Sequence, residues 1–574
     1  MKKNIFIRAY HLIPPTHRKK GIWIVSLLVI NSFLDFFSIA FFVPLILLII
    51  NPSFVSSNAF AGALYSFLGM ESIKSFIIYL TLGVLVFVLV KNIFSVWIAR
   101  IKINYAFEIA HSLSSRAISN YMEISFADFS HVDFTRELNR IANYPLSFAN
   151  NIIVPITTVL TEIIICILFL SWMAYYDYKM LLLLFAILLP VFVVYQQRKK
   201  ILGQINKNFK ENYPALLKST LQVVEGFPEI KTYQKESFFH QKFHALSRGI
   251  TQIFIKDQSF QAGTIRLTEI IIGFIMCSLI IYTVSAYQDF QKTLMLLGLY
   301  SGASFRMIPS ANRLLHASQQ LSMHNYVVDE LNFKEHLKII KFESEPTFQF
   351  NDSISFRNVS FQYPSGPVAL KNISFTIRKG EKVGITGNSG EGKTTLLLLL
   401  LRFFKQTEGE ILVDGGLIRN ENSWRKLLAY VPQNPYIVDG TLSENIAFGI
   451  SPNEINRNKV LQIIDDLDLN DVVRQLPGGI DSRIGERGSK LSGGQRQRIA
   501  IARALYADVE ILLFDEATNQ VHSSLESDIL DLLNYISRKN KTIIMVTHKI
   551  QANFFDSIFH LEKSAMKEVE VTHD

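Results

Sequence analysis

The chain has 574 residues, of which 49% are hydrophobic and 12% aromatic, and its formal net charge is +9. This length is too great for a single hydrophobic core, so we expect at least two domains. The basic residues gather at the ends of apolar runs, as in residues 17–20 and 198–200. That placement favours anionic lipid headgroups and argues against a nucleic-acid partner. Cys166 and Cys277 both lie inside apolar runs, so a disulfide framework is not implied.

Residues 1–335 form a predicted transmembrane domain. A helix needs about 20 apolar residues to cross a bilayer, and six stretches meet this requirement. They are residues 21–50, 73–97, 152–175, 180–195, 267–287 and 294–315. The first is interpreted as a permanent span and not as a cleaved signal peptide. Lys and Arg cluster before the first span and after the second and fourth, so the positive-inside rule predicts that both termini are cytoplasmic.

The loops on the predicted cytoplasmic side are long and contain few Gly or Pro, which indicates membrane helices that continue into the cytoplasm. Tyr121–Phe129 and Val223–Glu236 are short mixed segments at which such a helical hairpin can turn, with an ordinary loop as the alternative. On the outer side, residues 58–70 place apolar side chains at helical spacing. This predicts either a helix on the membrane surface or a packed outer loop. The apolar side chains are Phe60, Leu64, Phe67 and Leu68.

The pattern changes after residue 335: residues 336–350 are a predicted linker, and residues 351–574 alternate strands with polar turns as in an α/β domain. The apolar strand 382–386 runs into a glycine loop and then a helix-forming run, which is the context of a P-loop. The glycines let backbone N–H groups surround phosphates; Lys393 would contact the β- and γ-phosphates of ATP, and Thr394 would bind Mg²⁺. The predicted ATP-binding residues here are Asn388, Ser389, Gly390, Glu391, Gly392, Lys393, Thr394 and Thr395.

Two acids follow a second apolar strand, residues 511–514. Four consecutive apolar residues indicate a buried central strand and not a surface acid pair. Asp515 is placed to hold Mg²⁺, directly or through water, and Glu516 is placed to polarise the attacking water.

A third motif decides the class. It reads Leu491, Ser492, Gly493, Gly494, Gln495 and matches the signature of ABC ATPases. The whole chain, six predicted spans followed by one cassette, resembles the ABC exporters. The resemblance implies a membrane α-helical domain joined to an α/β P-loop ATPase. It also implies a homodimer in which Ser492 to Gln495 of one chain cap the γ-phosphate on the P-loop of the other.

Further site residues follow from this resemblance. Tyr363 resembles the aromatic residue that stacks on adenine, Gln433 the Q-loop glutamine that senses Mg²⁺, and His548 the switch histidine that contacts the γ-phosphate. Gly485–Gly488 resembles the exporter X-loop, and the two turn segments become predicted coupling helices. One element departs from the pattern: residues 519–522 read Asn-Gln-Val-His where the family usually has Ser-Ala-Leu-Asp, so the hydrolysis rate and its coupling to transport are expected to differ.

The membrane half must select the cargo, since ATP hydrolysis is common to all such pumps. Residues 306–313 resemble the sixth span of bacterial flippases for polyprenyl-diphosphate-linked oligosaccharides, as do acids in the first, third and fifth spans. These acids are Asp35, Glu162 and Glu269. Arg306 and Arg313 lie seven residues apart on one helix face, and Arg266 is expected at a depth similar to Arg313. Three arginines in one cavity would suit a diphosphate.

Alternatives stay open at this point. In one alternative, the arginines pair with Asp35 and Glu269 and serve only to hold helices together. In others, the cargo is a peptide, another lipid or a hydrophobic drug, and a non-transporting ABC channel or regulator is a further class. The expected location is the bacterial cytoplasmic membrane, with membrane lipids as neighbours of the protein.

Overall fold

The computed structural model describes residues 5–50, 52, 55, 59–70, 72–129, 132–176, 208–209, 212–286, 290–332, 349–364, 366–485, 488–516, 523–538, 540–547 and 553–569. They fall into two compact units. The first contains residues 1–124 and 131–339, and the second contains residues 125–130 and 340–574. The short segment 125–130 therefore belongs to the second unit although it lies between two helices of the first in sequence.

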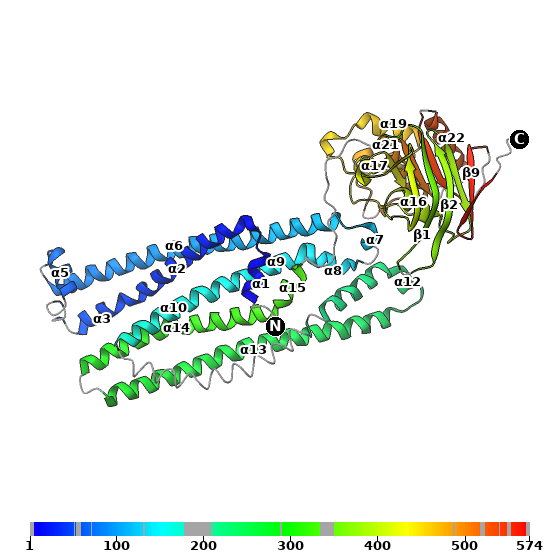
Figure 1. The fold of residues 1–574 in the computed structure, drawn as a ribbon. Coiled ribbons are helices and arrows are strands. Elements are labelled where there is room, and N and C mark those ends of the chain that lie inside the picture. Colours follow the sequence, from blue (N-terminus) through cyan, green and yellow to red (C-terminus); the bar gives the residue numbers. More distant parts are fainter. Residues whose placement is uncertain are drawn as a thin grey trace. The chain divides into compact units, whose positions relative to one another are not determined.

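The first unit consists of helices that run along one another (Figure 1). Two π-helical turns, Asn139–Asn143 and Ala149–Ile153, join α8, α9 and α10. The helices are α1 (Ile5–Leu12), α2 (Pro15–Ala40), α3 (Phe42–Ile50), α5 (Ala59–Phe67), α6 (Ile73–Met122), α8 (Phe134–Leu138), α9 (Tyr144–Phe148), α10 (Val154–Tyr176), α12 (Phe227–Thr232), α13 (Glu236–Ala286), α14 (Phe290–Met323) and α15 (Asn325–Leu331).

Among the described residues, three helical stretches are long and apolar enough to cross a membrane: Pro15–Ile46, Ile73–Met122 and Phe134–Tyr175. They contain the second and third predicted spans and residues 21–46 of the first. The fifth predicted span lies within α13 up to its last described residue, Ala286, and the sixth lies within α14; both are continuous helices. The fourth predicted span, residues 180–195, lies outside the described residues.

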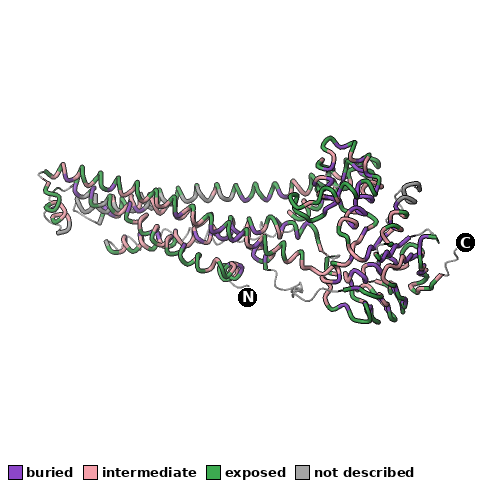
Figure 2. The backbone as a smooth tube through the Cα atoms, turned by 90° about the horizontal axis from the view of Figure 1, so that it is seen from above, coloured by how far each residue is buried: buried purple, intermediate pink, exposed green. Residues whose placement is uncertain are grey.

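Helix α6 illustrates why these elements form. Ser72 caps its start, since its hydroxyl accepts the Ser75 N–H at 3.2 Å, and the helix then runs for 50 residues without a Pro. It continues well past the predicted membrane segment, as the long cytoplasmic connection indicated. Ile78, Leu82 and Ile93 lie exposed along it, a stripe at helical spacing that lipid would cover. Exposed residues follow the long helices in the same way throughout the first unit (Figure 2).

The outer segment forms the short helix α5, but its apolar side chains do not share one environment. Leu64 packs against the buried side chains of Leu48, Val55 and Phe76. Phe67, in contrast, is 85% exposed. The segment is thus a helix that is anchored on one side by packing.

The second unit is built on two β-sheets, one of four strands in the order β2-β1-β4-β5 and one of six in the order β10-β9-β3-β8-β7-β6. Strands β6, β7, β8, β3 and β9 pair in parallel, whereas the four-stranded sheet is antiparallel. The strands are β1 (Ser353–Gln362), β2 (Val368–Arg378), β3 (Lys382–Gly387), β4 (Glu408–Val413), β5 (Gly416–Leu417), β6 (Leu428–Val431), β7 (Ile511–Asp515), β8 (Thr542–Val546), β9 (Ser557–Glu562) and β10 (Ala565–Val569). Parallel order places the carboxyl ends of β3, β6 and β7 at one edge, where ligands bind in such sheets.

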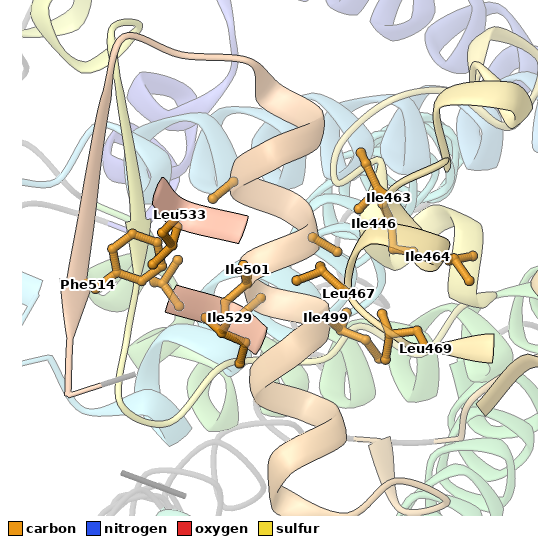
Figure 3. Packing of buried hydrophobic residues seen from close by; sticks show 14 of the residues in the cluster. Ile446, Ile463, Ile464, Leu467, Leu469, Ile499, Ile501, Phe514, Ile529 and Leu533 are labelled. Carbon is orange, nitrogen blue, oxygen red and sulfur yellow. The ribbon is translucent and has the colours of Figure 1, made fainter. Parts of the chain in front are cut away.

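Helices cover the parallel sheet and bury its apolar residues. In Figure 3, Phe514, Ile529 and Leu533 pack on one side of α21, and side chains of α19 pack on the other. All five residues of β7 are buried, which confirms the central strand expected from its apolar run. The helices are α16 (Lys393–Leu400), α17 (Glu421–Arg425), α18 (Leu442–Ile446), α19 (Arg457–Asp466), α20 (Asn470–Gln475), α21 (Gly493–Ala507) and α22 (Ser523–Ser537), with 3₁₀ turns at Pro452–Glu454 and Gly479–Asp481.

Both predicted coupling segments contain a short helix, α7 (Phe126–Phe129) in the first and α12 in the second. Helix α7 packs as part of the second unit, because the Phe126 ring stacks on Phe403 with centroids 4.6 Å apart and meets Phe404 edge-on at 5.6 Å. The apolar side chain of Phe126 therefore attaches this segment to the cassette.

Candidate nucleotide site and the ion pairs of the membrane half

The loop between β3 and α16 has the backbone of a phosphate-binding loop. Gly390 and Gly392 have backbone φ values of +85° and +100°, which residues other than glycine rarely adopt. A Cβ on Gly392 would also lie 2.6 Å from the Ala369 carbonyl oxygen. In the same loop, the Glu391 carboxylate accepts the Asn388 N–H at 2.8 Å. The pKa of Glu391 is lowered, chiefly by this backbone bond, so Glu391 contributes a fixed negative charge to the loop.

Lys393 begins α16 and folds back over the loop. Its Nζ donates to the carbonyl oxygens of Gly387 at 2.8 Å and Asn388 at 2.9 Å, and its side chain is only 4% exposed. These weak acceptors hold the ammonium in place without neutralising it. Lys393 is thus ready to exchange carbonyl contacts for the oxygens of a phosphate.

The two predicted acids lie beside this lysine at the end of β7. The Thr394 hydroxyl donates to Asp515 Oδ1 at 3.0 Å, and Gln433 Nε2 donates to Glu516 Oε2 at 2.9 Å. Glu516 Oε1 is 3.9 Å from Lys393 Nζ. The structure therefore brings together the predicted phosphate-binding, metal-binding and catalytic residues of three separate motifs.

Glu516 has a left-handed backbone, with φ of +51°, although it is not glycine. Its N–H still donates to the Val546 carbonyl oxygen of β8 at 3.1 Å. The chain turns sharply at this residue while remaining attached to the sheet. Such sparsely populated conformations concentrate at functional sites.

Hydroxyl and carboxylate oxygens are the ligands that Mg²⁺ prefers, so Thr394 and Asp515 fit this ion and Gln433 lies nearby. Burial raises the pKa of Asp515, and hydrogen bonds from Tyr430 and Thr394 oppose this rise. In the described part of the chain, no three His, Cys, Asp or Glu side chains are grouped to hold a metal. The remaining ligands of an Mg²⁺ ion here would be ATP phosphate oxygens and water.

Tyr363, the predicted adenine-stacking residue, is half-buried beside the loop. Its hydroxyl lies 3.0 Å from Thr395 Oγ1, and its ring packs edge-on against Phe361 and Phe404. These contacts fix one edge of the ring. Adenine stacking by Tyr363, and phosphate contacts by Ser389 and Gly390, stay predictions.

The signature motif forms the start of α21. Ser492 Oγ accepts the Gln495 N–H at 3.2 Å, and Gln495 Oε1 accepts the Ser492 N–H at 2.8 Å, which makes a capping box. Gln495 therefore has a structural role in the cap in addition to its predicted place near the phosphate. Gly493 and Gly494 open the helix without side chains, so their N–H groups remain approachable.

Some predicted site elements lie outside the described residues. These are His548, the departing segment 519–522, and Glu486 and Arg487 of the X-loop. Their roles stay predictions.

The predicted substrate arginines Arg306 and Arg313 both contact acids on other helices. Arg306 Nη2 donates to Asp35 Oδ2 at 3.0 Å. Arg313 makes a two-pronged contact with Glu162, in which Nε meets Oε1 and Nη2 lies 3.3 Å from Oε2. Helix α14 is thereby joined to α2 and α10.

Arg266 differs from the other two. It pairs with Glu269 one turn along its own helix, at 2.7 Å, and the two side chains are 78% and 52% exposed. Among the ion pairs of the described residues, Arg266 shares no acidic partner with Arg306 or Arg313. The structure thus groups two of the three predicted arginines on α14 and leaves the third in a surface pair.

Two residues that the sequence pattern did not single out contact the predicted acids. Lys91 Nζ lies 2.7 Å from Asp35 Oδ1, and the Tyr430 hydroxyl donates to Asp515 Oδ2 at 3.0 Å. A lysine inside a predicted span is itself a signal, because intramembrane charges are costly and face partners or cavities. Tyr430 gave no such signal, since a strand tyrosine usually serves packing.

Comparison with known proteins finds matches to both the membrane half and the cassette. The profile of the ABC transporter transmembrane region matches residues 22–298, and the ABC transporter profile matches residues 370–519. The chain is 30% identical over 389 residues to an ATP-dependent lipid A-core flippase of Photorhabdus laumondii, and 29% identical over 385 residues to that of Methylobacillus flagellatus. Each match covers 66% of this chain and 65% of the flippase.

A protein of Rickettsia bellii described as an export ATP-binding/permease protein is 44% identical over 226 residues, which are 38% of each chain. The chain therefore spans less than two thirds of each of these three relatives. A solved bacterial Atm1-family ABC exporter with ATP bound superposes with a TM-score of 0.74, over 96% of this chain and 94% of that one. At 20% identity this likeness concerns the fold alone.

The chain is an ABC exporter half-transporter, with one helical transmembrane domain and one ABC ATPase domain in a single polypeptide. It has the ABC exporter fold and is a multi-pass membrane protein.

Proposed function

We propose that this protein uses ATP hydrolysis to flip an amphipathic lipid with a phosphate-bearing headgroup between membrane leaflets, and that its substrate is a polyprenyl-diphosphate-linked oligosaccharide. One observation supports the energy source: Lys393, Thr394, Asp515, Glu516 and Gln433 converge at one edge of the sheet, through two hydrogen bonds of 3.0 and 2.9 Å and an ion pair of 3.9 Å. A membrane domain in the same chain provides the helices that such an ATPase would move. We place it in the bacterial cytoplasmic membrane with both termini cytoplasmic.

The residues of the site divide the chemistry of ATP hydrolysis. Mg²⁺, held by Thr394 and Asp515, would neutralise phosphate charge when bound. Lys393 would bind phosphate oxygens in place of the carbonyls that it now contacts. Glu516, held by Gln433 and 3.9 Å from Lys393, would accept a hydrogen bond from the attacking water and orient it.

We also propose a homodimer. Gly493 and Gly494 begin a capped helix, and a helix N-terminus of this kind stabilises a phosphate. In the proposed dimer, this phosphate is the γ-phosphate on Lys393 of the partner chain. A Lys393→Ala chain and a Ser492→Arg chain should each hydrolyse no ATP alone, and a mixture of the two should recover activity from one intact site per dimer. Normal hydrolysis by either single variant would contradict the composite site.

The substrate class is supported by charge in the membrane half. Asp35 meets two cations, Lys91 and Arg306, so this group of three carries one positive charge in excess. Arg313 and Glu162 cancel each other. A net positive charge among apolar helices favours an anionic headgroup, and both Lys and Arg bind phosphate oxygens well. The relatives named lipid A-core flippases match over both halves of the chain, which supports a lipid cargo.

The test compares Lys91→Met with Lys20→Met in ATP-fuelled flipping by reconstituted vesicles. Both lysines pair with an acid across helices α2 and α6, Lys91 with Asp35 and Lys20 with the exposed Glu108. Lys91→Met removes the excess charge but keeps the Asp35–Arg306 pair. We expect it to slow flipping of a polyprenyl-diphosphate oligosaccharide about tenfold or more, since it removes a charged contact to phosphate, while Lys20→Met has little effect.

Equal flipping by both variants would contradict the diphosphate substrate. ATP-dependent movement of a neutral amphipathic drug or a peptide, with no movement of the diphosphate lipid, would replace it by that cargo. ATP hydrolysis with no transported substrate would indicate the non-transporting class.

A further inference from the structure

Tyr430 lies one strand away from the acid that it contacts. Strand β6 pairs in parallel with β7, with Val431 opposite Phe514, so the end of β6 lies beside Asp515. The Tyr430 hydroxyl donates to Asp515 Oδ2 at 3.0 Å, while the Thr394 hydroxyl donates to Oδ1 at 3.0 Å. Both carboxylate oxygens are therefore fixed, from β6 on one side and from α16 on the other.

The two hydroxyl groups differ in what they can do at a metal site. The oxygen of Thr394 is a hard ligand of the kind that Mg²⁺ takes. The phenol of Tyr430 is a hydrogen-bond donor to the carboxylate and lies on its far oxygen. Outer partners of this type orient the ligands of a metal and raise its affinity. Tyr430 is thus the described group that can hold Asp515 while Thr394 serves the metal.

The same segment also reaches the catalytic acid. Gln433 follows Tyr430 after two residues, and its amide donates to Glu516 Oε2 at 2.9 Å. One short segment therefore places a neutral donor on each of the two adjacent acids. A displacement of β6 would alter the orientation of both carboxylates together.

We propose that Tyr430 is a positioning residue of the magnesium site: its hydroxyl holds Asp515 Oδ2 so that Oδ1 faces Thr394 and the metal. The inference rests on the proposed ATPase function and extends it to a residue outside the recognised motifs.

The test is Tyr430→Phe in the full-length protein, which removes the hydroxyl and keeps the ring. Binding of a fluorescent ATP analogue is titrated with Mg²⁺ and, separately, measured in EDTA. We expect the Mg²⁺ concentration that gives half of the maximal increase in ATP-analogue binding to rise about tenfold. A change of this size is typical when an outer partner of a metal ligand is lost. Affinity in EDTA should stay unchanged. The matched control is Tyr506→Phe, which removes a hydroxyl that bonds the Asn456 N–H elsewhere in the same domain.

A double-variant cycle separates positioning from packing. In an Asp515→Asn background, Tyr430→Phe should cause no further change in the Mg²⁺ dependence, because the oriented carboxylate is already gone. An unaltered Mg²⁺ dependence in Tyr430→Phe would overturn the inference, and so would an equal loss of affinity in EDTA or full additivity with Asp515→Asn. Wild-type protein that binds no ATP analogue would overturn the proposed function as well, whereas a defect in lipid flipping alone would leave this inference standing.

Discussion

The cassette and the membrane half both hold pairs of acids among buried residues, but they treat these acids differently. In the cassette, two hydroxyls and an amide donate hydrogen bonds to Asp515 and Glu516, and one cation, Lys393, lies farther away, 3.9 Å from Glu516. In the membrane half, Asp35 and Glu162 are bound by lysine and arginine. Neutral donors orient a carboxylate and leave its charge available, whereas cations cancel it.

This difference follows from what each region must do. A metal and a phosphate bring their own charges to the cassette, so a site that already cancelled its charge would gain less on binding. A helix bundle in lipid offers no water to an unpaired carboxylate, so its acids need permanent partners. The excess cation at Asp35 is the exception in the membrane half, and the proposed anionic substrate rests on it.

The largest expected effect is the loss of ATP hydrolysis when Glu516 is replaced. Glu516→Gln keeps the hydrogen-bonding shape but removes the negative charge that orients water. We expect ATP hydrolysis to fall at least about 100-fold, while nucleotide binding stays within twofold and a closed dimer accumulates. Phosphate release and equilibrium ATP binding measure the two properties. Turnover at the wild-type rate would contradict the assignment of Glu516.

The second prediction concerns the acid whose charge is cancelled. Asp35→Ala removes the acid that Lys91 and Arg306 share. The group is partly buried, so we expect the loss to approach the cost of about 3 kcal/mol that is typical of breaking a buried pair. The unfolding temperature in detergent should drop clearly, and every activity should decline with it. Arg306→Ala leaves Asp35 with Lys91 and should be milder.

A stable Asp35→Ala variant would show that this ion group is not structural. The double variant Arg306→Ala, Arg313→Ala extends the comparison to cargo. If it is stable and still flips the diphosphate lipid, the arginines have no part in substrate binding.

The third prediction tests whether the predicted coupling segment that contains α7 is needed for ATP-driven transport. Phe126→Ala removes the ring that stacks on Phe403. We expect basal ATP hydrolysis to remain within about twofold, because no group of the ATP site is lost, and ATP-driven transport to fall several-fold. Phe129→Ala is the matched control, since Phe129 is 50% exposed. Equal effects of both variants on transport would argue against a specific role of Phe126.

The smallest expected effect is a pH-dependent one in the cassette. Burial acts against the charge of Asp414, but N–H groups of Asn351, Asp352 and Ser353 lower its pKa below the usual value. Its stabilising contribution is therefore present above the unfolded pKa of about 3.9 and is lost as the pH falls through the lower folded value.

Asp414→Asn should lower the unfolding temperature of the cassette by a few degrees at pH 7. The difference from wild type should shrink as the pH falls below about 4. A difference that is the same at both pH values would mean that the charge of Asp414 is not responsible.

The sequence by itself determined the class and the order of the two domains, and it predicted which residues form the ATP site. These features depend on local patterns: apolar runs of membrane length, a glycine loop between a strand and a helix, and a serine with two glycines at a helix start. Each pattern is complete within a few residues of the chain. Gly392 and Ser492 could therefore be assigned before any contact was known.

Only the tertiary structure decided which side chains meet across elements. In the tertiary structure, Arg313 forms an ion pair with Glu162 and Lys91 forms one with Asp35. Arg266 lies in an exposed ion pair, and the Tyr430 hydroxyl donates a hydrogen bond to Asp515. These contacts join residues that are far apart in the chain, and their distances depend on the rotation and register of helices and strands. A one-residue change in register turns a side chain to another face, and no local pattern in the sequence specifies that register.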